Sequence, residues 1–259
     1  MSDVTTVPAA IETLEFDTDD GLGQKARIGL IVLQTDQTIE FEFARLMPGC
    51  GTAFYHARIP NAMEVSPETL RQMQRDLPAT AALLPPSFEF NAIGYACTSG
   101  ATMIGEDQVD RIIRDVHPHA KTSNPITAGK AALSALGLSR IALVTPYPPE
   151  VTLEMQANLH AAGVHTVAVA SFNQSDDFTV ARISSASILK AATTIGAREE
   201  IEGVFISCTS LRALEIIEAA EAQINKPVIA SNQALAWHLM RLAGLSDRPA
   251  DAGQLFKTA

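Results

Sequence analysis

The sequence has few basic residues, few aromatic residues and few cysteines. Its 19 lysines and arginines stand against 29 aspartates and glutamates, giving a formal net charge of −10. That balance has the wrong sign for neutralising nucleic-acid phosphates or anionic lipid, so we expect no nucleic-acid partner. The three cysteines form no CxxC pair and no Cys/His spacing matches a zinc site, so we expect no metal.

Long apolar runs and phosphate-binding motifs are missing as well. The longest apolar runs have the length of strands, which predicts that no segment spans a membrane. Residues 1–23 are acidic, lack a signal-peptide pattern and predict an N-terminal extension of a cytoplasmic protein. Neither GxGxxG nor a P-loop occurs, so nucleotide binding through those loops is not expected.

Short apolar runs alternate with segments of helical periodicity over residues 27–245, a pattern typical of βα units around parallel sheets. Asn124 before Pro125 predicts a capped helix start, and Gly137 and Gly163 predict helix ends. The expected strands are 26–33, 90–96, 139–145, 165–170, 203–207 and 227–230. The expected helices are 106–116, 126–136, 149–162, 179–192, 211–222 and 232–243. We expect 45–60 and 171–177 to be pocket-shaping loops.

Two stretches repeat each other: FNAIGYACTSG (90–100) and IEGVFISCTSL (201–211) both run as apolar strand, Cys-Thr-Ser and helix. The repeat predicts an α/β fold of two pseudo-symmetric lobes, each a parallel sheet flanked by helices. We expect residues 24–124 plus 229–247 in the first lobe and 125–228 in the second. Ligands of such sheets bind beyond the carboxyl ends of the strands, so the active site is expected in the interlobe cleft.

Cys97 and Cys208 are the candidate catalytic residues. A thiol acts as a thiolate or as a proton donor, and a helix N-terminus lowers its pKa. The alternative is that each cysteine is a small buried hydrophobe, which the repetition of the motif disfavours. Cys50, in PGCG, has no such twin and is interpreted as structural. The residues after the two cysteines offer hydroxyls and backbone N–H groups for a substrate carboxylate: Thr98, Ser99, Thr209 and Ser210.

GYACTSG, SCTSLRALEII, GLIVLQTDQTIEFEF and RIALVTPYPPEV resemble the aspartate/glutamate racemase superfamily. The branch that they resemble contains maleate cis-trans isomerases, arylmalonate decarboxylase and the ectoine-utilisation racemase-like proteins. The resemblance covers residues 27–245. It implies two lobes with one cysteine from each on opposite sides of the substrate, matching Cys97 and Cys208, and no metal, flavin or pyridoxal cofactor. It also implies a substrate-binding Tyr147, in the TPY motif, and a substrate-binding Asn173.

One position departs from the maleate isomerase pattern. LQTDQTIE places Asp36 where PSSNTTVE has a substrate-binding asparagine. A carboxylate there would repel a dicarboxylate unless it faced a cation. It could receive a substrate ammonium, or orient and deprotonate Cys97 as in glutamate racemases. An Asx turn between strand and helix is the structural alternative, and Tyr147 could equally be a packing residue at a Pro-rich turn.

The leading interpretation is an enzyme, a cofactor-independent two-cysteine racemase or isomerase that transfers a proton beside a carboxylate of a small amino acid or dicarboxylate. One alternative is maleate cis-trans isomerisation, in which Cys97 adds to the double bond. The other is a non-catalytic two-lobed metabolite-binding protein. The expected partner is a small carboxylate substrate, and a homodimer is possible. His117 and His119 are expected in a solvated loop, without ligand spacing.

Overall fold

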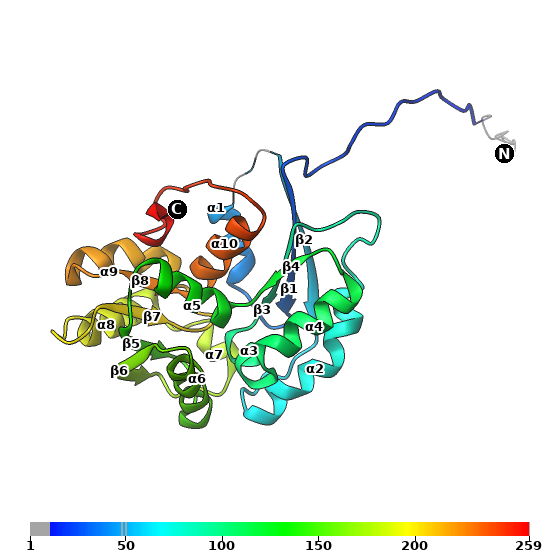
Figure 1. Cartoon of the computed structure of the whole chain (residues 1–259). Coiled ribbons are helices and arrows are strands. Elements are labelled where there is room, and N and C mark those ends of the chain that lie inside the picture. Colours follow the sequence, from blue (N-terminus) through cyan, green and yellow to red (C-terminus); the bar gives the residue numbers. More distant parts are fainter. Residues whose placement is uncertain (1–10, 48, 50, 259) are drawn as a thin grey trace, which may run out of the picture.

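Two four-stranded parallel sheets flanked by helices make up the fold (Figure 1). The computed structural model describes residues 11–47, 49 and 51–258. Cys50 and the first ten residues of the predicted N-terminal extension lie outside the described residues. Residues 11–20 of that extension are exposed, and in Figure 1 they run away from the body of the molecule.

The first half of the chain contains β1 (Ala26–Leu33), α1 (Ile39–Leu46), β2 (Thr52–Ile59), α2 (Pro67–Ala81), β3 (Ala92–Ala96), α3 (Thr98–Ile104), α4 (Glu106–Val116), β4 (Lys121–Ser123) and α5 (Pro125–Ala135). The second half contains β5 (Arg140–Thr145), α6 (Pro149–Ala161), β6 (His165–Ser171), α7 (Asp177–Val180), α8 (Ser185–Gly196), β7 (Gly203–Ile206), η1 (Leu214–Ile216), α9 (Ile217–Ile224), β8 (Val228–Ala230), α10 (Ser231–Leu242) and η2 (Leu255–Lys257).

The two sheets have the same topology. Their strand orders are β2-β1-β3-β4 and β6-β5-β7-β8, so each strand of the first sheet has a counterpart four strands later, and all pairs are parallel. This equivalence confirms the predicted α/β fold with two similar sheets. It also gives β3 and β7, which precede the two cysteines, the same place in their sheets.

The central strands are buried because helices cover both faces of each sheet. Every residue of the inner strands β3 and β7 is buried, and so is every residue of the short edge strand β8, which accounts for their apolar sequences. The edge strands β2 and β6 are half-exposed. The TAFYHARI sequence of β2 therefore lacks the continuous apolar signal, and the expectation of a loop over 45–60 is wrong for residues 52–59.

The predicted capping residues mark real helix ends. The Asn124 side chain accepts from the backbone N–H of Thr127 at 3.0 Å and caps α5, as predicted. Gly137 and Gly163 have φ of 69° and 81°, the left-handed conformation that ends a helix. The expected helix 179–192 is wrong as one element, because it is interrupted between α7 and α8, where Ser184 caps the second helix.

Helix α10 connects the two halves of the molecule. It packs on β3 and β4 of the first sheet and on α1 and α5, and it begins directly after β8 of the second sheet. These contacts agree with the idea that the end of the chain returns to the first lobe. The residue boundaries of the two lobes stay a prediction.

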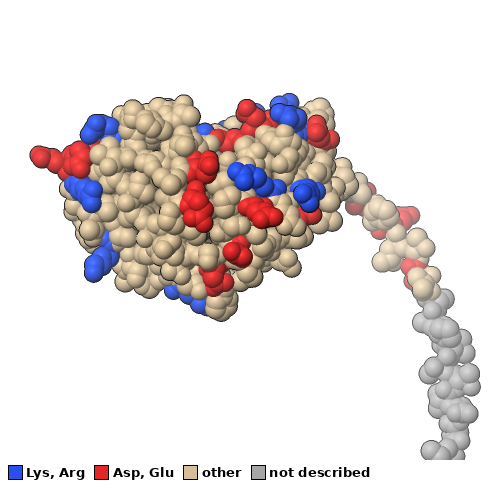
Figure 2. Space-filling model, turned by 90° about the horizontal axis from the view of Figure 1, so that it is seen from below, with Lys and Arg blue, Asp and Glu red and all other residues tan. Residues whose placement is uncertain are grey.

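Charged residues are dispersed over the surface. On the face shown in Figure 2, acidic and basic side chains are scattered among larger uncharged areas, without a broad basic surface. Within the described residues, no helix has the length and apolar character needed to cross a membrane.

Candidate active site

Cys97 lies at the carboxyl end of β3 and is the N-cap of α3, as predicted. Its thiol accepts from the backbone N–H of Gly100 at 3.2 Å and lies 3.7 Å from the Ser99 hydroxyl. The side chain is buried. Thr98 and Ser99, also buried, occupy the first turn of α3, where backbone N–H groups have no intrahelical acceptor.

Cys208 lies at the equivalent end of β7, but no helix begins there. Its φ is 120°, a conformation that costs a residue with a side chain about 1–3 kcal/mol and that clusters at functional sites. The expected helix 211–222 begins later, as η1 and α9. Side chains of other segments hold this turn instead: Asn232 donates to the Thr209 carbonyl at 2.8 Å and Thr38 to the Ser210 carbonyl at 2.9 Å.

Burial dominates the acidity of both thiols. It raises the pKa of Cys97 to about 12, although the Gly100 N–H and the Ser99 hydroxyl lower it. It also raises the pKa of Cys208, with the negative charge of Asp177 as the next cause. The expectation that helix starts lower both thiol pKa values is therefore wrong for this structure, because desolvation outweighs the stabilising donors.

The Tyr147 phenol lies with the two thiols. Tyr147 follows β5 and is buried. Burial raises its pKa well above 10, and the charges of Cys208 and then Cys97 raise it further. The phenol interacts with the Cys208 side chain and lowers the pKa of that thiol. The structure thus brings Cys97, Cys208 and Tyr147 into one electrostatically coupled group.

A hydrogen-bonded chain links the two cysteine turns directly. The Ser231 hydroxyl accepts from the backbone N–H of Cys208 at 3.0 Å and lies 2.9 Å from the Thr98 hydroxyl. The Thr209 hydroxyl donates to the Ala96 carbonyl, next to Cys97, at 3.4 Å. The two Cys-Thr-Ser turns therefore meet where the two sheets approach each other.

Asp36 lies at the carboxyl end of β1 and is buried. Its Oδ1 accepts from the backbone N–H groups of Thr38 at 2.7 Å and Ile39 at 2.9 Å, so the Asx turn is present. Burial raises the pKa of Asp36. Thr38 of the same turn donates to the Ser210 carbonyl, so Asp36 lies close to the Cys208 turn, and its charge is a minor cause, after burial, of the raised pKa of both thiols.

Of the remaining predicted residues, Ser210 lies in the buried site and Asn173 does not. Ser210 is buried and donates to Asp177 at 3.0 Å. Asn173 is exposed in the loop after β6, with φ of 52°, and its backbone N–H donates to the Ser171 hydroxyl at 2.9 Å. The structure therefore does not bring Asn173 into the buried group.

Four buried polar residues at this site were not predicted: Glu42, Asp177, Ser231 and Asn232. Glu42 accepts from the Leu214 backbone N–H at 2.9 Å and from the Asn232 amide at 2.8 Å, joining α1 to the segment after Cys208. Ser231 and Asn232 directly follow β8, so the strand-end rule that identified the cysteines could have found them.

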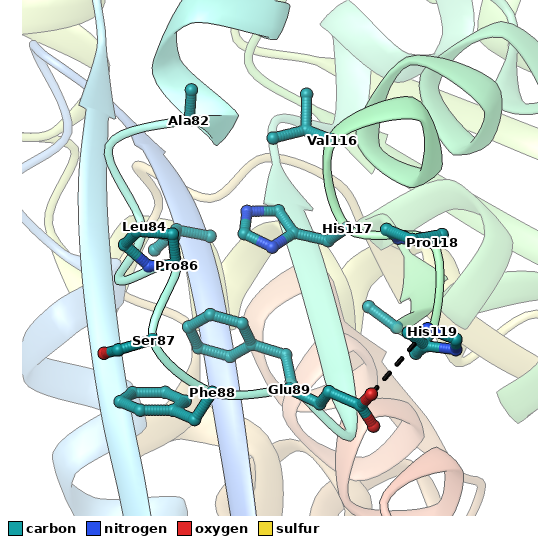
Figure 3. Close-up of a pocket in the computed structure, with 12 residues that line it drawn as sticks. Ala82, Leu84, Pro86, Ser87, Phe88, Glu89, Val116, His117, Pro118 and His119 are labelled. Atoms are coloured by element: carbon teal, nitrogen blue, oxygen red, sulfur yellow. Dashed lines mark ion pairs between the residues drawn. The ribbon is translucent and has the colours of Figure 1, made fainter.

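A cavity of about 410 Å³ lies away from the two cysteines, at the opposite end of the first sheet (Figure 3). It is lined by residues that precede β3 and β4, among them Phe88, Phe90, His117 and His119. His119 approaches Glu89 at 3.7 Å, and His117 lies 2.9 Å from the Ala81 carbonyl. Across the described part of the chain, no group of three His, Cys, Asp or Glu side chains is arranged to hold a metal ion.

The fold and the site define a two-lobed α/β protein with one buried cysteine at the equivalent strand end of each sheet. A family model described as arylmalonate decarboxylase matches residues 118–256, more than half of the chain. The chain belongs to this family, as the resemblance to its branch predicts. It is an enzyme of this family, and the choice of reaction and substrate is argued below.

Sequence relatives extend the match over most of the chain. A maleate isomerase of Nocardia farcinica is 27% identical over 241 residues, covering 89% of this chain and 95% of the relative. An arylmalonate decarboxylase of Bordetella bronchiseptica is 29% identical over 119 residues, 46% of this chain and 50% of the relative.

Solved structures share the fold. A Cys-to-Ser mutant of the Nocardia farcinica maleate cis-trans isomerase, with a covalently bound succinylcysteine intermediate, superposes with a TM-score of 0.80 at 25% identity. The match covers 89% of this chain and 98% of that one. The Pseudomonas putida S16 maleate isomerase with maleate also gives a TM-score of 0.80, at 22% identity, with 90% and 98% covered.

Proposed function

We propose that the chain is a cofactor-independent isomerase that uses Cys97 and Cys208 to move a proton at a carbon beside a carboxylate, racemising a small amino acid or dicarboxylate. The observation that carries the proposal is the pair of buried thiols at equivalent strand ends, on turns that Ser231 links through the Cys208 N–H and the Thr98 hydroxyl. Both thiols also affect the pKa of the Tyr147 phenol. Serines would serve equally well for binding alone, so a duplicated thiol favours chemistry.

The proposed reaction needs one thiolate and one thiol. The thiolate takes the α-proton from one face, so the C–H bond breaks and an S–H bond forms. The electron pair moves into the carboxylate as an enediolate. The opposite thiol then gives its proton to the other face of the carbon and becomes the thiolate. At the end of the reaction the carbon centre is inverted, the first cysteine is a thiol and the second is a thiolate, so one proton has been taken up and one released.

The enediolate charge requires hydrogen-bond donors. The backbone N–H groups of Thr98 and Ser99, at the start of α3, are suited to hold it because they have no intrahelical acceptor. The phenol of Tyr147 adds a donor whose raised pKa keeps it protonated. These three residues would bind the carboxylate, and Cys97 and Cys208 would act on the neighbouring carbon.

Cis-trans isomerisation of maleate is the second candidate. It is favoured by the succinylcysteine intermediate seen in the Nocardia farcinica relative. In this chain Cys97 would add to the double bond while Cys208 supplies a proton, rotation about the new single bond would follow, and Cys208 would reclaim the proton as the Cys97–carbon bond breaks.

The test is proton NMR in deuterated buffer with maleate, aspartate, glutamate and diaminobutyrate derivatives. Wild type, Cys97→Ser and Cys208→Ser are compared, with Cys50→Ser as the matched thiol-loss control. Racemase chemistry predicts loss of an α-proton signal in wild type and Cys50→Ser but in neither other variant. Conversion of maleate to fumarate would establish the second candidate. Binding of a ligand without any reaction would contradict both and support the binding-protein alternative.

A further inference from the structure

Two buried carboxylates, one following a strand of each sheet, lie beside the thiols. Asp36 follows β1 and is 2% exposed, and Asp177 begins α7 after β6 and is 5% exposed. The two side chains are close enough that the charge of Asp177 raises the pKa of Asp36. Both carboxylates lie at the Cys208 turn: Asp177 accepts from Ser210, and Thr38, whose backbone N–H donates to Asp36, donates to the Ser210 carbonyl. Their charges accordingly act with burial to raise the pKa of both thiols.

Hydroxyl groups position Asp177 across the interface between the sheets. Its Oδ1 accepts from Ser210, after β7, at 3.0 Å, and its Oδ2 accepts from Thr35, after β1. The backbone of the same segment is fixed as well, because the N–H of Asp177 donates to the Met63 carbonyl at 3.0 Å. The carboxylate is therefore held in place at the site by both halves of the chain.

Within the part of the chain that the structure describes, neither carboxylate has a counter-ion. In residues 11–47, 49 and 51–258, no Lys, Arg or His lies within 4.0 Å of either carboxylate as an ion-pair partner. Arg58 donates to the backbone carbonyls of Gln34 and Asp36, at 3.1 Å each, but its ion pair is with Glu40. Burying two negative charges without a cation is costly, so the arrangement calls for a positive group from elsewhere.

One carboxylate oxygen is left without a hydrogen bond. Oδ2 of Asp36 is fully buried and has no hydrogen-bond partner among the described residues, while Oδ1 accepts two backbone donors. The Thr209 hydroxyl is near enough to lower the pKa of Asp36, but its single proton is directed to the Ala96 carbonyl. An unpaired buried acceptor costs about 1–3 kcal/mol, which a bound donor would recover.

We propose that Asp36 and Asp177 form a subsite for a positively charged group of the substrate, so that the substrate is a small amino acid carrying an ammonium group. This inference rests on the proposed function, because it assigns a substrate class to the same site. An ammonium offers three donors and one positive charge, which satisfies the orphaned Oδ2 and offsets both carboxylates. A dicarboxylate without an ammonium would add negative charge to a site that already holds two.

The subsite also bears on how readily the thiols ionise. After burial, which is the largest cause, the charges of Asp177 and Asp36 further disfavour a thiolate at either cysteine. A bound ammonium neutralises those charges, so the substrate itself would make thiolate formation easier. Binding of the correct substrate and activation of the sulfur would then be one event.

The test uses ligand pairs that differ only by the ammonium: aspartate with succinate, and 2-aminobutyrate with butyrate. Dissociation constants are measured by calorimetry on the Cys97→Ser/Cys208→Ser variant, which prevents turnover. We expect the ammonium-bearing member to bind at least about tenfold tighter, as one charge-assisted contact at a buried site allows. Adding Asp36→Asn or Asp177→Asn should each remove most of that preference.

Matched controls separate charge from folding. Asparagine keeps the shape and one acceptor oxygen, and thermal unfolding checks that each variant is folded. Glu221→Gln removes another buried carboxylate, one bonded to the backbone of Val228 and Gln254, and should keep the full preference. Equal or tighter binding of the ammonium-free ligands, no binding of either class, or a preference unchanged in both Asn variants would overturn the inference.

The same measurements distinguish this inference from the proposed function. Cysteine-dependent turnover without an ammonium preference would leave the isomerase standing and remove the subsite. An ammonium preference that needs both aspartates, in a protein that never exchanges an α-proton, would keep the subsite and remove the isomerase.

Discussion

The backbone N–H of Cys208 donates to the hydroxyl of Ser231 at 3.0 Å. Ser231 is fully buried and also contacts the Thr98 hydroxyl, so one side chain connects the turns that carry both cysteines. The Cys208 residue is held at an unfavourable φ of 120°, and this hydrogen bond helps to hold it there.

Ser231→Ala should therefore impair both stability and catalysis. It leaves the Cys208 N–H without an acceptor, which costs about 1–3 kcal/mol of unfolding free energy. We expect turnover to fall by about tenfold or more, because sub-ångström placement of the thiol matters for proton transfer. The control is Ser123→Ala, which removes a buried hydroxyl bonded to His238 at 2.8 Å and should lower stability but not turnover. Equal turnover loss in both variants would contradict this role.

Gly100→Ala should disturb Cys97 selectively. A methyl group at this position would lie 2.8 Å from the Cys97 sulfur and 2.7 Å from the Tyr95 hydroxyl, closer than real contacts allow. The overpacking should cost about 1–3 kcal/mol. Gly129→Ala creates a similar clash, 2.8 Å from the Phe205 ring, and is the matched control. The free energy of unfolding, measured in denaturant, should fall in both variants, whereas only Gly100→Ala should lose turnover.

Alkylation of the thiols should depend steeply on pH. Since the pKa of Cys97 is raised to about 12 by burial, its thiolate fraction rises about tenfold per pH unit from pH 7 to 10. We expect iodoacetamide rates for Cys97, measured by peptide mass spectrometry on Cys50→Ser protein, to follow that slope. A rate that levels off below pH 9 would mean that the thiol is as acidic as free cysteine.

Glu42 should make the protein less stable as the pH rises. Burial raises the pKa of Glu42 to about 7, above its usual 4.5, so the folded state binds a proton that the unfolded state has released. The contribution of the Glu42 proton to the free energy of unfolding is complete below about pH 4.5. It is lost as the pH rises through 7, a decrease of about 3 kcal/mol in total. The stability of Glu42→Gln relative to wild type, measured by urea unfolding, should be more favourable at pH 8 than at pH 5. A difference that does not change with pH would contradict this assignment.

Local signals predicted the fold and the place of the two cysteines at strand ends. β1 and α4 match their expected bounds, because a continuous apolar strand and an amphipathic helix are visible within one short segment. The Cys-Thr-Ser repeat identified the two equivalent strand ends without any tertiary information.

What the sequence could not predict depends on contacts between distant segments. Asp177 acquires its place through Thr35 and Ser210, far away in the chain. The raised thiol pKa values depend on burial at the junction of the two sheets, whereas the sequence displays only the helix start after Cys97. Strand β2 escaped prediction because a half-exposed edge strand carries a mixed sequence.

The most direct test of the two-cysteine account follows one enantiomer of the reacting amino acid in deuterated buffer at early times. If Cys97 and Cys208 act on opposite faces, the product enantiomer should carry deuterium at its α-carbon while the recovered substrate keeps its proton, and neither Cys97→Ser nor Cys208→Ser should form product. Deuterium appearing equally in recovered substrate and product, or racemisation that survives the loss of either cysteine, would contradict it.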